Sequence, residues 1–274
     1  MRKIGLCLHP GRSIENIDDQ LRLMKQYGFD STFAGDTLLS EKDPAAIADL
    51  IAKHGISYES IHAPFRHIND IWFDIPEGQQ MLEELKVNVD RCALSNVPTL
   101  VTHLSSSITP PAPTDIGRSR FIELVEYAAK KNVNIAFENL RTLANLAWAF
   151  EEFDKAENVG FCWDCGHEYC FTPGQRYMPL FGHKLIFTHI HDNTCEYDRD
   201  RHLIPFDGSM PFDFIAQQLK DSGYQGTLMS ESFPRFTPGI YNSYQDCTTE
   251  EFIRRSADAM KKLRIMVDGE SEIL

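Results

Sequence analysis

Short apolar runs rich in β-forming residues alternate with longer amphipathic stretches from one end of the chain to the other. Strands are predicted over Lys3–His9, Ser31–Gly35, Tyr58–Ala63, Thr99–Leu104, Asn134–Asn139, Val159–Cys165, Leu185–His191 and Gly226–Glu231. Helices are predicted over Ile14–Tyr27, Pro44–His54, Gly78–Ser95, Ile116–Lys131, Leu143–Asp154, Pro211–Ser222 and Thr249–Val267. This alternation predicts parallel strands joined by crossover helices. The sixth unit is the weakest, because Phe171–Gly182 allows only a short helix.

Glycine and proline positions agree with these boundaries. Gly28, Gly55 and Gly223 each follow a predicted helix, where a left-handed cap is needed. Pro44 and Pro211 stand where first helical turns would begin. Eight strands, each followed by a helical stretch, predict an α/β protein with a closed (β/α)8 TIM barrel. Such a barrel takes about 250 residues. The chain has 274 residues and no low-complexity linker, so we expect one barrel domain over residues 1–274.

The composition is that of an ordinary globular protein with an acidic balance. Hydrophobic residues make up 42% and charged residues 24% of the chain. The formal net charge of −13 repels phosphate backbones, so no nucleic-acid partner is expected. No apolar run approaches the roughly 18 residues of a membrane span, and the N-terminal segment lacks the features of a signal peptide. Seven scattered cysteines suit reduced thiols, so we expect a cytoplasmic protein without a membrane partner.

Histidine, aspartate and glutamate side chains concentrate at the ends of the predicted strands. From strand three to strand eight these end residues are His62, His103, Glu138, Asp164 with His167, His189 with His191, and Glu231. In a (β/α)8 barrel these ends meet at one mouth, where active sites lie. Core-facing carboxylates need a partner, and a divalent cation is the simplest one.

Glu138, Asp164, His189 and Glu231 come from four consecutive predicted strands, five to eight. Two glutamates, one aspartate and one imidazole suit Mn²⁺, Co²⁺ or Zn²⁺, and they suit Mg²⁺ less well because of the imidazole. The sequence therefore predicts one divalent metal ion in this half of the rim, with the remaining opening left for a substrate.

Two further patterns have structural alternatives. Cys162 and Cys165 spell a CxxC motif, but residues three apart on a strand point to opposite faces. We therefore interpret this pair as buried packing rather than as a metal or redox site. The aromatic residues Phe33, Phe65 and Trp72 could line a pocket or pack as ordinary loop residues.

A series of motifs runs in order through almost the whole chain. The motifs are Ile61-His62-Ala63-Pro64-Phe65, Phe137-Glu138-Asn139, Asp164-Cys165-Gly166-His167, His189-Ile190-His191-Asp192-Asn193, Asp200-Arg201-His202-Leu203-Ile204-Pro205 and Gly223-Tyr224-Gln225-Gly226. In this order the chain resembles the xylose isomerase-like (β/α)8 superfamily, in particular the sugar phosphate isomerase/epimerase group. That group includes inosose dehydratases, ketose 3-epimerases and hydroxypyruvate isomerases. The resemblance implies the same metal ligands, Glu138, Asp164, His189 and Glu231, with His189 rather than His191 as the imidazole ligand. It also implies that His167 contacts substrate.

The chain also resembles the apurinic-endonuclease IV family, which shares the barrel and binds three zinc ions. The additional ligand positions of that family are filled here by His62, His103, His167, Asp200 and His202. A second or third metal ion is therefore an open alternative. The acidic charge and the absence of arginine-rich loops that would enter DNA argue against a nuclease.

These features predict a divalent-metal-dependent isomerase or epimerase of a small sugar or related polyol ketone. The metal would hold a carbonyl and the adjacent hydroxyl, and Glu138 and Glu231 would exchange a proton as base and acid through an enediolate. The expected substrate-binding residues are His62, His103, His167, Asp200, Arg201 and His202. The alternatives are a dehydratase of inosose type, a multi-zinc phosphoesterase or abasic-site endonuclease, and a sugar-binding barrel without turnover.

The sequence favours an unphosphorylated carbohydrate, because no glycine-rich phosphate cradle follows strands seven or eight. Arginines in the predicted mouth loops could bind a phosphate or carboxylate: Arg66, Arg141, Arg201 and Arg235. The resemblance also implies a homodimer or homotetramer, since both are common among the relatives.

Overall fold

The computed structural model describes residues 1–8, 14–35, 38–39, 43–234, 243–244 and 246–269. Its strands are β1 (Ile4–Leu8), β2 (Ser31–Gly35), β3 (Ser57–His62), β4 (Thr99–His103), β5 (Asn134–Glu138), β6 (Val159–Asp164), β7 (Leu185–His189) and β8 (Leu228–Ser230). Two positions singled out above, His9 and Arg235, lie outside the described residues.

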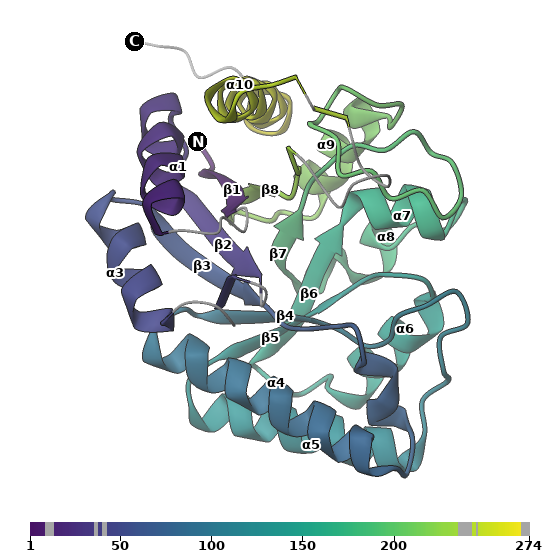
Figure 1. The fold of residues 1–274 in the computed structure, drawn as a ribbon. Coiled ribbons are helices and arrows are strands. Elements are labelled where there is room, and N and C mark those ends of the chain that lie inside the picture. The colour runs from purple at the N-terminus through teal and green to yellow at the C-terminus, as the bar shows by residue number, and fades with distance from the viewer. Residues whose placement is uncertain (9–13, 36–37, 40–42, 235–242, 245, 270–274) are drawn as a thin grey trace.

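The eight parallel strands are ordered β7-β6-β5-β4-β3-β2-β1-β8 around the barrel (Figure 1). The seam between β7 and β8 is made by a parallel bridge between Ile190 and Ser230. Across it, the Ile190 N–H donates to the Met229 carbonyl (2.8 Å) and the Glu231 N–H donates to the Ile190 carbonyl (2.9 Å). The predicted (β/α)8 fold is confirmed.

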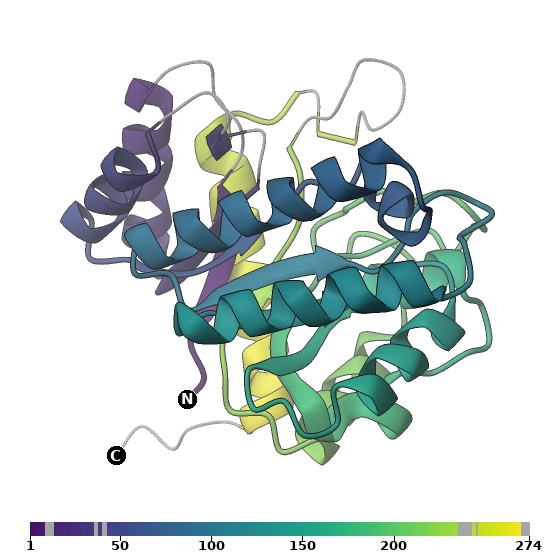
Figure 2. The ribbon, with the colours of Figure 1, turned by 90° about the horizontal axis from the view of Figure 1, so that it is seen from below.

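Helices surround the strands on the outside, as Figures 1 and 2 show. They are α1 (Ile14–Tyr27), α3 (Pro44–Lys53), α4 (Pro76–Leu94), α5 (Asp115–Lys130), α6 (Leu143–Glu152), α7 (Cys165–Phe171), α8 (Met178–Phe181), α9 (Phe212–Asp221) and α10 (Thr249–Asp268). Short 3₁₀ segments are η1 (Ile68–Trp72) and η2 (Gly182–Lys184). The last helix, α10, packs against α1 and α9 and so joins the two ends of the chain (Figure 1). Among the described residues, no helix combines the length and apolar character needed to cross a membrane.

The helix boundaries follow from local chemistry. Gly28, Gly55 and Gly223 have φ values of +91°, +64° and +70°, so the predicted left-handed caps are confirmed. Pro44 begins α3, where the Asp43 carboxylate accepts a hydrogen bond from the Ala45 N–H (3.1 Å). Pro211 is the residue before the first turn of α9 rather than within that turn.

The sixth unit differs from its prediction. The strand ends at Asp164, and α7 begins at Cys165, so the prediction that His167 closes a strand is wrong. The physical reason is a side-chain cap, since the Asp164 carboxylate accepts a hydrogen bond from the His167 N–H (2.6 Å) and starts a helix there. The helix predicted over Phe171–Gly182 is replaced by α7 and the single turn α8. His167 thus lies in the first turn of a helix that opens directly onto the mouth.

Candidate metal centre

The ends of strands five to eight bring four ligand-bearing side chains together. Ligand atoms of Glu138, Asp164, His189 and Glu231 all lie within 4.8 Å of one another. The first three are the last residues of β5, β6 and β7, and Glu231 follows β8 directly. His189 Nδ1 lies 3.3 Å from Glu138 Oε2 and 3.4 Å from Glu231 Oε2. The structure therefore brings together the four residues that the sequence predicts as ligands, and all four are buried.

The two ring nitrogens of His189 are better explained as ligands of a bound cation than as groups buried in a core without metal. Neither ring nitrogen of His189 makes a hydrogen bond, although the side chain is fully buried. His103 shows the same absence at both ring nitrogens. Buried polar atoms are usually paired, so unpaired nitrogens that face a carboxylate need another partner. Imidazole and carboxylate ligands of this kind suit Mn²⁺, Co²⁺ or Zn²⁺.

Glu138 is the carboxylate at the centre of the imidazoles. Its Oε2 lies 3.2 Å from His62 Nε2 and 3.3 Å from His103 Nε2, while Oε1 lies 3.2 Å from His167 Nδ1. Burial opposes its charge, but His189 and His103 outweigh that cost and hold the pKa of Glu138 well below its usual value. Glu138 is therefore ionised and shared between two sets of possible ligands, because His62, His103 and Glu138 also form a group of their own.

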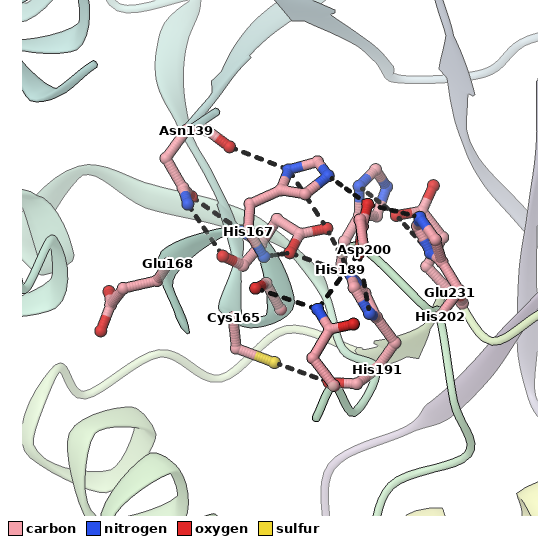
Figure 3. A network of polar contacts seen from close by, with 12 residues as sticks. Asn139, Cys165, His167, Glu168, His189, His191, Asp200, His202 and Glu231 are labelled. Carbon is pink, nitrogen blue, oxygen red and sulfur yellow. Dashed lines mark hydrogen bonds and ion pairs between the residues drawn. The ribbon is translucent and has the colours of Figure 1, made fainter. Parts of the chain in front are cut away.

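A second cluster of four lies beside the first, and Figure 3 shows its side chains converging. Its members are His167, His191, Asp200 and His202. Asp200 Oδ2 lies 3.2 Å from His167 Nε2 and 2.9 Å from His202 Nε2. The rings of His191 and His202 stack with centroids 4.0 Å apart. These side chains, from α7 and from the segment between β7 and α9, form a second group that could hold a cation.

His191 connects the two clusters, although it was not predicted as a ligand. Its Nε2 lies 3.1 Å from both carboxylate oxygens of Asp164. Gly166 lies so close to the ring that an added Cβ would overlap it, which explains a glycine in the first turn of α7. The spacing of His189 and His191 could have predicted this, because residues two apart in an extended segment share a face.

Three histidines share a hydrogen-bonding pattern that is typical of metal ligands. In His62, His167 and His202, Nδ1 donates to a main-chain carbonyl at 2.8, 3.0 and 2.8 Å respectively. Each ring is left with Nε2 directed at a carboxylate, Glu138 for His62 and Asp200 for the other two. Such outer hydrogen bonds fix the tautomer and orientation of a ligating imidazole.

Two of the predicted arginines, Arg201 and Arg141, pair with loop carboxylates. Arg201 Nη2 pairs with Glu196 (3.4 Å) on the exposed loop. Arg141 pairs with Asp198 (2.6 Å) and stacks on the Phe171 ring. The structure therefore places the main chain of residue 201, but not its guanidinium, beside Asp200.

Aromatic residues border the clusters on one side. Phe33 stacks on His189 with ring centroids 4.7 Å apart, and Phe65 lies 4.9 Å from His103 with half of its surface exposed. Trp72 is instead fully buried among the helices, where its Nε1 donates to the Leu104 carbonyl (2.6 Å). Of the three aromatic candidates, Phe33 and Phe65 lie beside the site and Trp72 is a packing residue.

Asn139 holds the ends of β5 and β6 in register beneath the site. Its Oδ1 accepts from the Asp164 N–H (2.8 Å) and its Nδ2 donates to the Asp164 carbonyl (2.8 Å). We expect Asn139→Ala to destabilise the protein by about 1–3 kcal/mol for each buried main-chain group left unpaired. Metal affinity should fall in parallel, because Asp164 loses its fixed position. Thermal unfolding and metal titration measure both effects, and unchanged values for both would contradict this role.

The carboxyl groups differ in their electrostatic setting. Burial, together with the charges of Glu138 and Asp164, raises the pKa of Glu231 well above its usual value. His202 and His167 hold the pKa of Asp200 well below its usual value despite burial. In the metal-free protein Glu231 therefore binds a proton more readily than Glu138, Asp164 or Asp200 does.

This difference predicts how pH affects the metal-free protein. A carboxyl whose pKa is raised by folding contributes stability below its unfolded pKa and loses it as pH rises through the folded pKa. We therefore expect metal-free Glu231→Gln to unfold at a higher temperature than the metal-free wild type at pH 8. Each kcal/mol of relieved repulsion corresponds to about 2–4 °C in Tm. If calorimetry gave an equal or lower Tm for the variant, the buried Glu231 carboxylate would not be destabilising the metal-free protein.

Comparison with known proteins gives a family and a fold. A family model described as xylose isomerase-like TIM barrel matches residues 21–263. The uncharacterized protein y4fM of Sinorhizobium fredii is 29% identical over 172 residues, which cover 57% of this chain and 54% of that relative. A D-psicose 3-epimerase crystallised in the presence of D-fructose has a TM-score of 0.75 at 15% identity, covering 97% of this chain and all of that one. The 3-keto-D-glucoside 4-epimerase YcjR from E. coli has a TM-score of 0.71 at 19% identity, covering 96% and 99%.

Proposed function

Since the chain belongs to the xylose isomerase-like TIM barrel family, we propose that it is a divalent-metal-dependent isomerase or epimerase of a small sugar or related polyol ketone. The observation that carries this proposal is the buried quartet Glu138, Asp164, His189 and Glu231, with its unpaired imidazole nitrogens. Similarity in fold to two sugar epimerases supports the substrate class.

The two glutamates are suited to move a proton. When bound to the quartet, a divalent cation would polarise a substrate carbonyl and stabilise negative charge on its oxygen. Glu138 ends β5 and Glu231 follows β8, and His189 Nδ1 lies 3.3 Å from the Glu138 carboxylate and 3.4 Å from the Glu231 carboxylate. One carboxylate removes the proton from the carbon next to the carbonyl, and the other delivers a proton to the resulting enediol carbon. The low pKa of Glu138 suits the base, and a cation bound to the quartet would offset the repulsion that raises the pKa of Glu231 in the metal-free protein.

The remaining polar residues would hold the substrate. His62, His103 and Phe65 line the side of the mouth opposite β7 and β8. We propose that these side chains contact one end of the sugar. His167 would orient a hydroxyl, and Asp200, His202 and the main chain of Arg201 would contact the distal end. Since all seven cysteines are free thiols, which suit a reducing compartment, we propose that the protein is cytoplasmic. We also propose that it assembles as a homodimer or homotetramer.

A hydrolase is the second candidate, and the two additional clusters favour it. The groups His62/His103/Glu138 and His167/His191/Asp200/His202 flank the quartet and could hold further zinc ions. A multi-zinc phosphoesterase or abasic-site endonuclease would use such a centre. An inosose-type dehydratase would use the same quartet as the isomerase and lose water after proton removal.

Metal content of the purified protein distinguishes these candidates. We expect about one Mn, Co or Zn per chain by mass spectrometry, because among the ligand groups of the described residues only the quartet combines three carboxylates with an unpaired imidazole. Two or three zinc ions per chain would favour the phosphoesterase, and abasic DNA would then be the substrate to test.

A further inference from the structure

Cys162 lies directly below the quartet on β6. It precedes Asp164 by two residues on the same strand, so both side chains face the barrel interior. The thiol is fully buried. Its Sγ, a carboxylate oxygen of Glu138 and a ring nitrogen of His189 lie within 4.8 Å of one another. This trio shares Glu138 and His189 with the quartet and replaces Asp164 and Glu231 by sulfur.

The other buried thiols have a different environment. Cys7, Cys92, Cys165 and Cys170 each donate to a main-chain carbonyl, at sulfur–oxygen distances of 3.5, 3.7, 3.5 and 3.7 Å. Within the described part of the chain, Cys162 has no such acceptor. Its neighbour His189 is fully buried, and neither of its ring nitrogens has a hydrogen-bond partner. The trio therefore combines a sulfur with unpaired nitrogen in a closed space.

We propose that Glu138, Cys162 and His189 form a sulfur-containing position for thiophilic cations, below the oxygen-rich quartet. This inference rests on the proposed metal centre and refines its selectivity. Thiolate ligands favour Zn²⁺, Co²⁺ and Cd²⁺, whereas carboxylates favour Mn²⁺ and Mg²⁺. Binding at the lower position replaces the thiol proton, which leaves to solvent, by a metal–sulfur bond. A cation held there is displaced from Asp164 and Glu231, so Cd²⁺ bound at this position should inhibit a Mn²⁺-loaded enzyme.

The test compares wild type with Cys162→Ser and a matched control, Cys165→Ser. Cys165 is an equally buried thiol close by, but its Sγ donates to the His191 carbonyl and belongs to none of the ligand groups. On Co²⁺ titration we expect a near-ultraviolet sulfur-to-cobalt charge-transfer band in wild type and Cys165→Ser. The band should be absent in Cys162→Ser. Cd²⁺ affinity should fall at least ~10-fold in Cys162→Ser, with Mn²⁺ affinity changed less than ~2-fold.

Cadmium-113 NMR of the wild-type protein gives a readout that needs no variant. A shift in the range of a sulfur ligand supports the proposal even if Cys162→Ser does not fold. Bound Co²⁺ without a charge-transfer band, or a band that persists in Cys162→Ser, would overturn the role of Cys162 and leave the quartet intact. Failure of wild type to bind any of these cations in calorimetry would overturn the proposed metal centre itself.

Discussion

Glu231→Gln is expected to reduce turnover by about 10²–10⁴-fold while the barrel stays folded, because the variant loses the carboxyl that exchanges a proton. Glu231 is buried at the mouth, and its Oε2 lies 3.4 Å from His189 Nδ1. Glutamine preserves the shape of the side chain and its buried oxygen but neither donates nor accepts a proton in the reaction. Turnover is measured as interconversion of ketose epimers, and circular dichroism verifies the fold.

A glutamate remote from the mouth supplies the control. Glu123 lies on α5 outside the barrel, where it pairs with Lys86 on α4. Glu123→Gln removes the same charge from the chain and should retain full turnover. Near-full activity of Glu231→Gln would exclude Glu231 as a proton-transfer residue.

Removal of the metal is expected to abolish turnover and to lower Tm substantially. Without a cation, three buried carboxyl groups share one space: Glu138, Asp164 and Glu231. A cation present at about 1,000 times its Kd stabilises the folded state by about 4 kcal/mol. That corresponds to a fall of about 8–16 °C in Tm on chelation, at about 2–4 °C for each kcal/mol.

Restoration with single metals completes this experiment. Mn²⁺ should restore both activity and Tm, and Ca²⁺ should restore neither, because it prefers a larger all-oxygen shell. Chelator already saturated with metal is the control for effects of the chelator itself. Full activity in thoroughly chelated protein would contradict a metal-dependent reaction.

The periodic pattern of the sequence was sufficient to predict the barrel and the residues at the strand ends. Parallel strands joined by crossover helices bring their carboxyl ends to one mouth, whatever the conformation of the loops. His62, His103, Glu138 and His189 are each the last residue of a strand, and they meet because the topology requires it. Their grouping could therefore be predicted before any loop was known.

The second cluster could not be predicted in the same way, because an irregular segment assembles it. His202 has φ +45° and Asp198 has φ +62°, conformations that no periodicity reveals. The segment is held by the buried carboxylate of Asp192, which accepts from the N–H groups of Gly208 (2.7 Å) and Met210 (3.1 Å).

Solvent hydrogen exchange into a sugar tests the central claim most directly. The metal-loaded protein is incubated with a ketose such as D-fructose in D₂O, and the sugar is examined by NMR. The account predicts deuterium at the carbon next to the carbonyl, dependent on the metal and absent with Glu231→Gln. No incorporation into any of a panel of ketoses, together with cleavage of abasic DNA by the same preparation, would contradict it and identify the protein as a phosphoesterase.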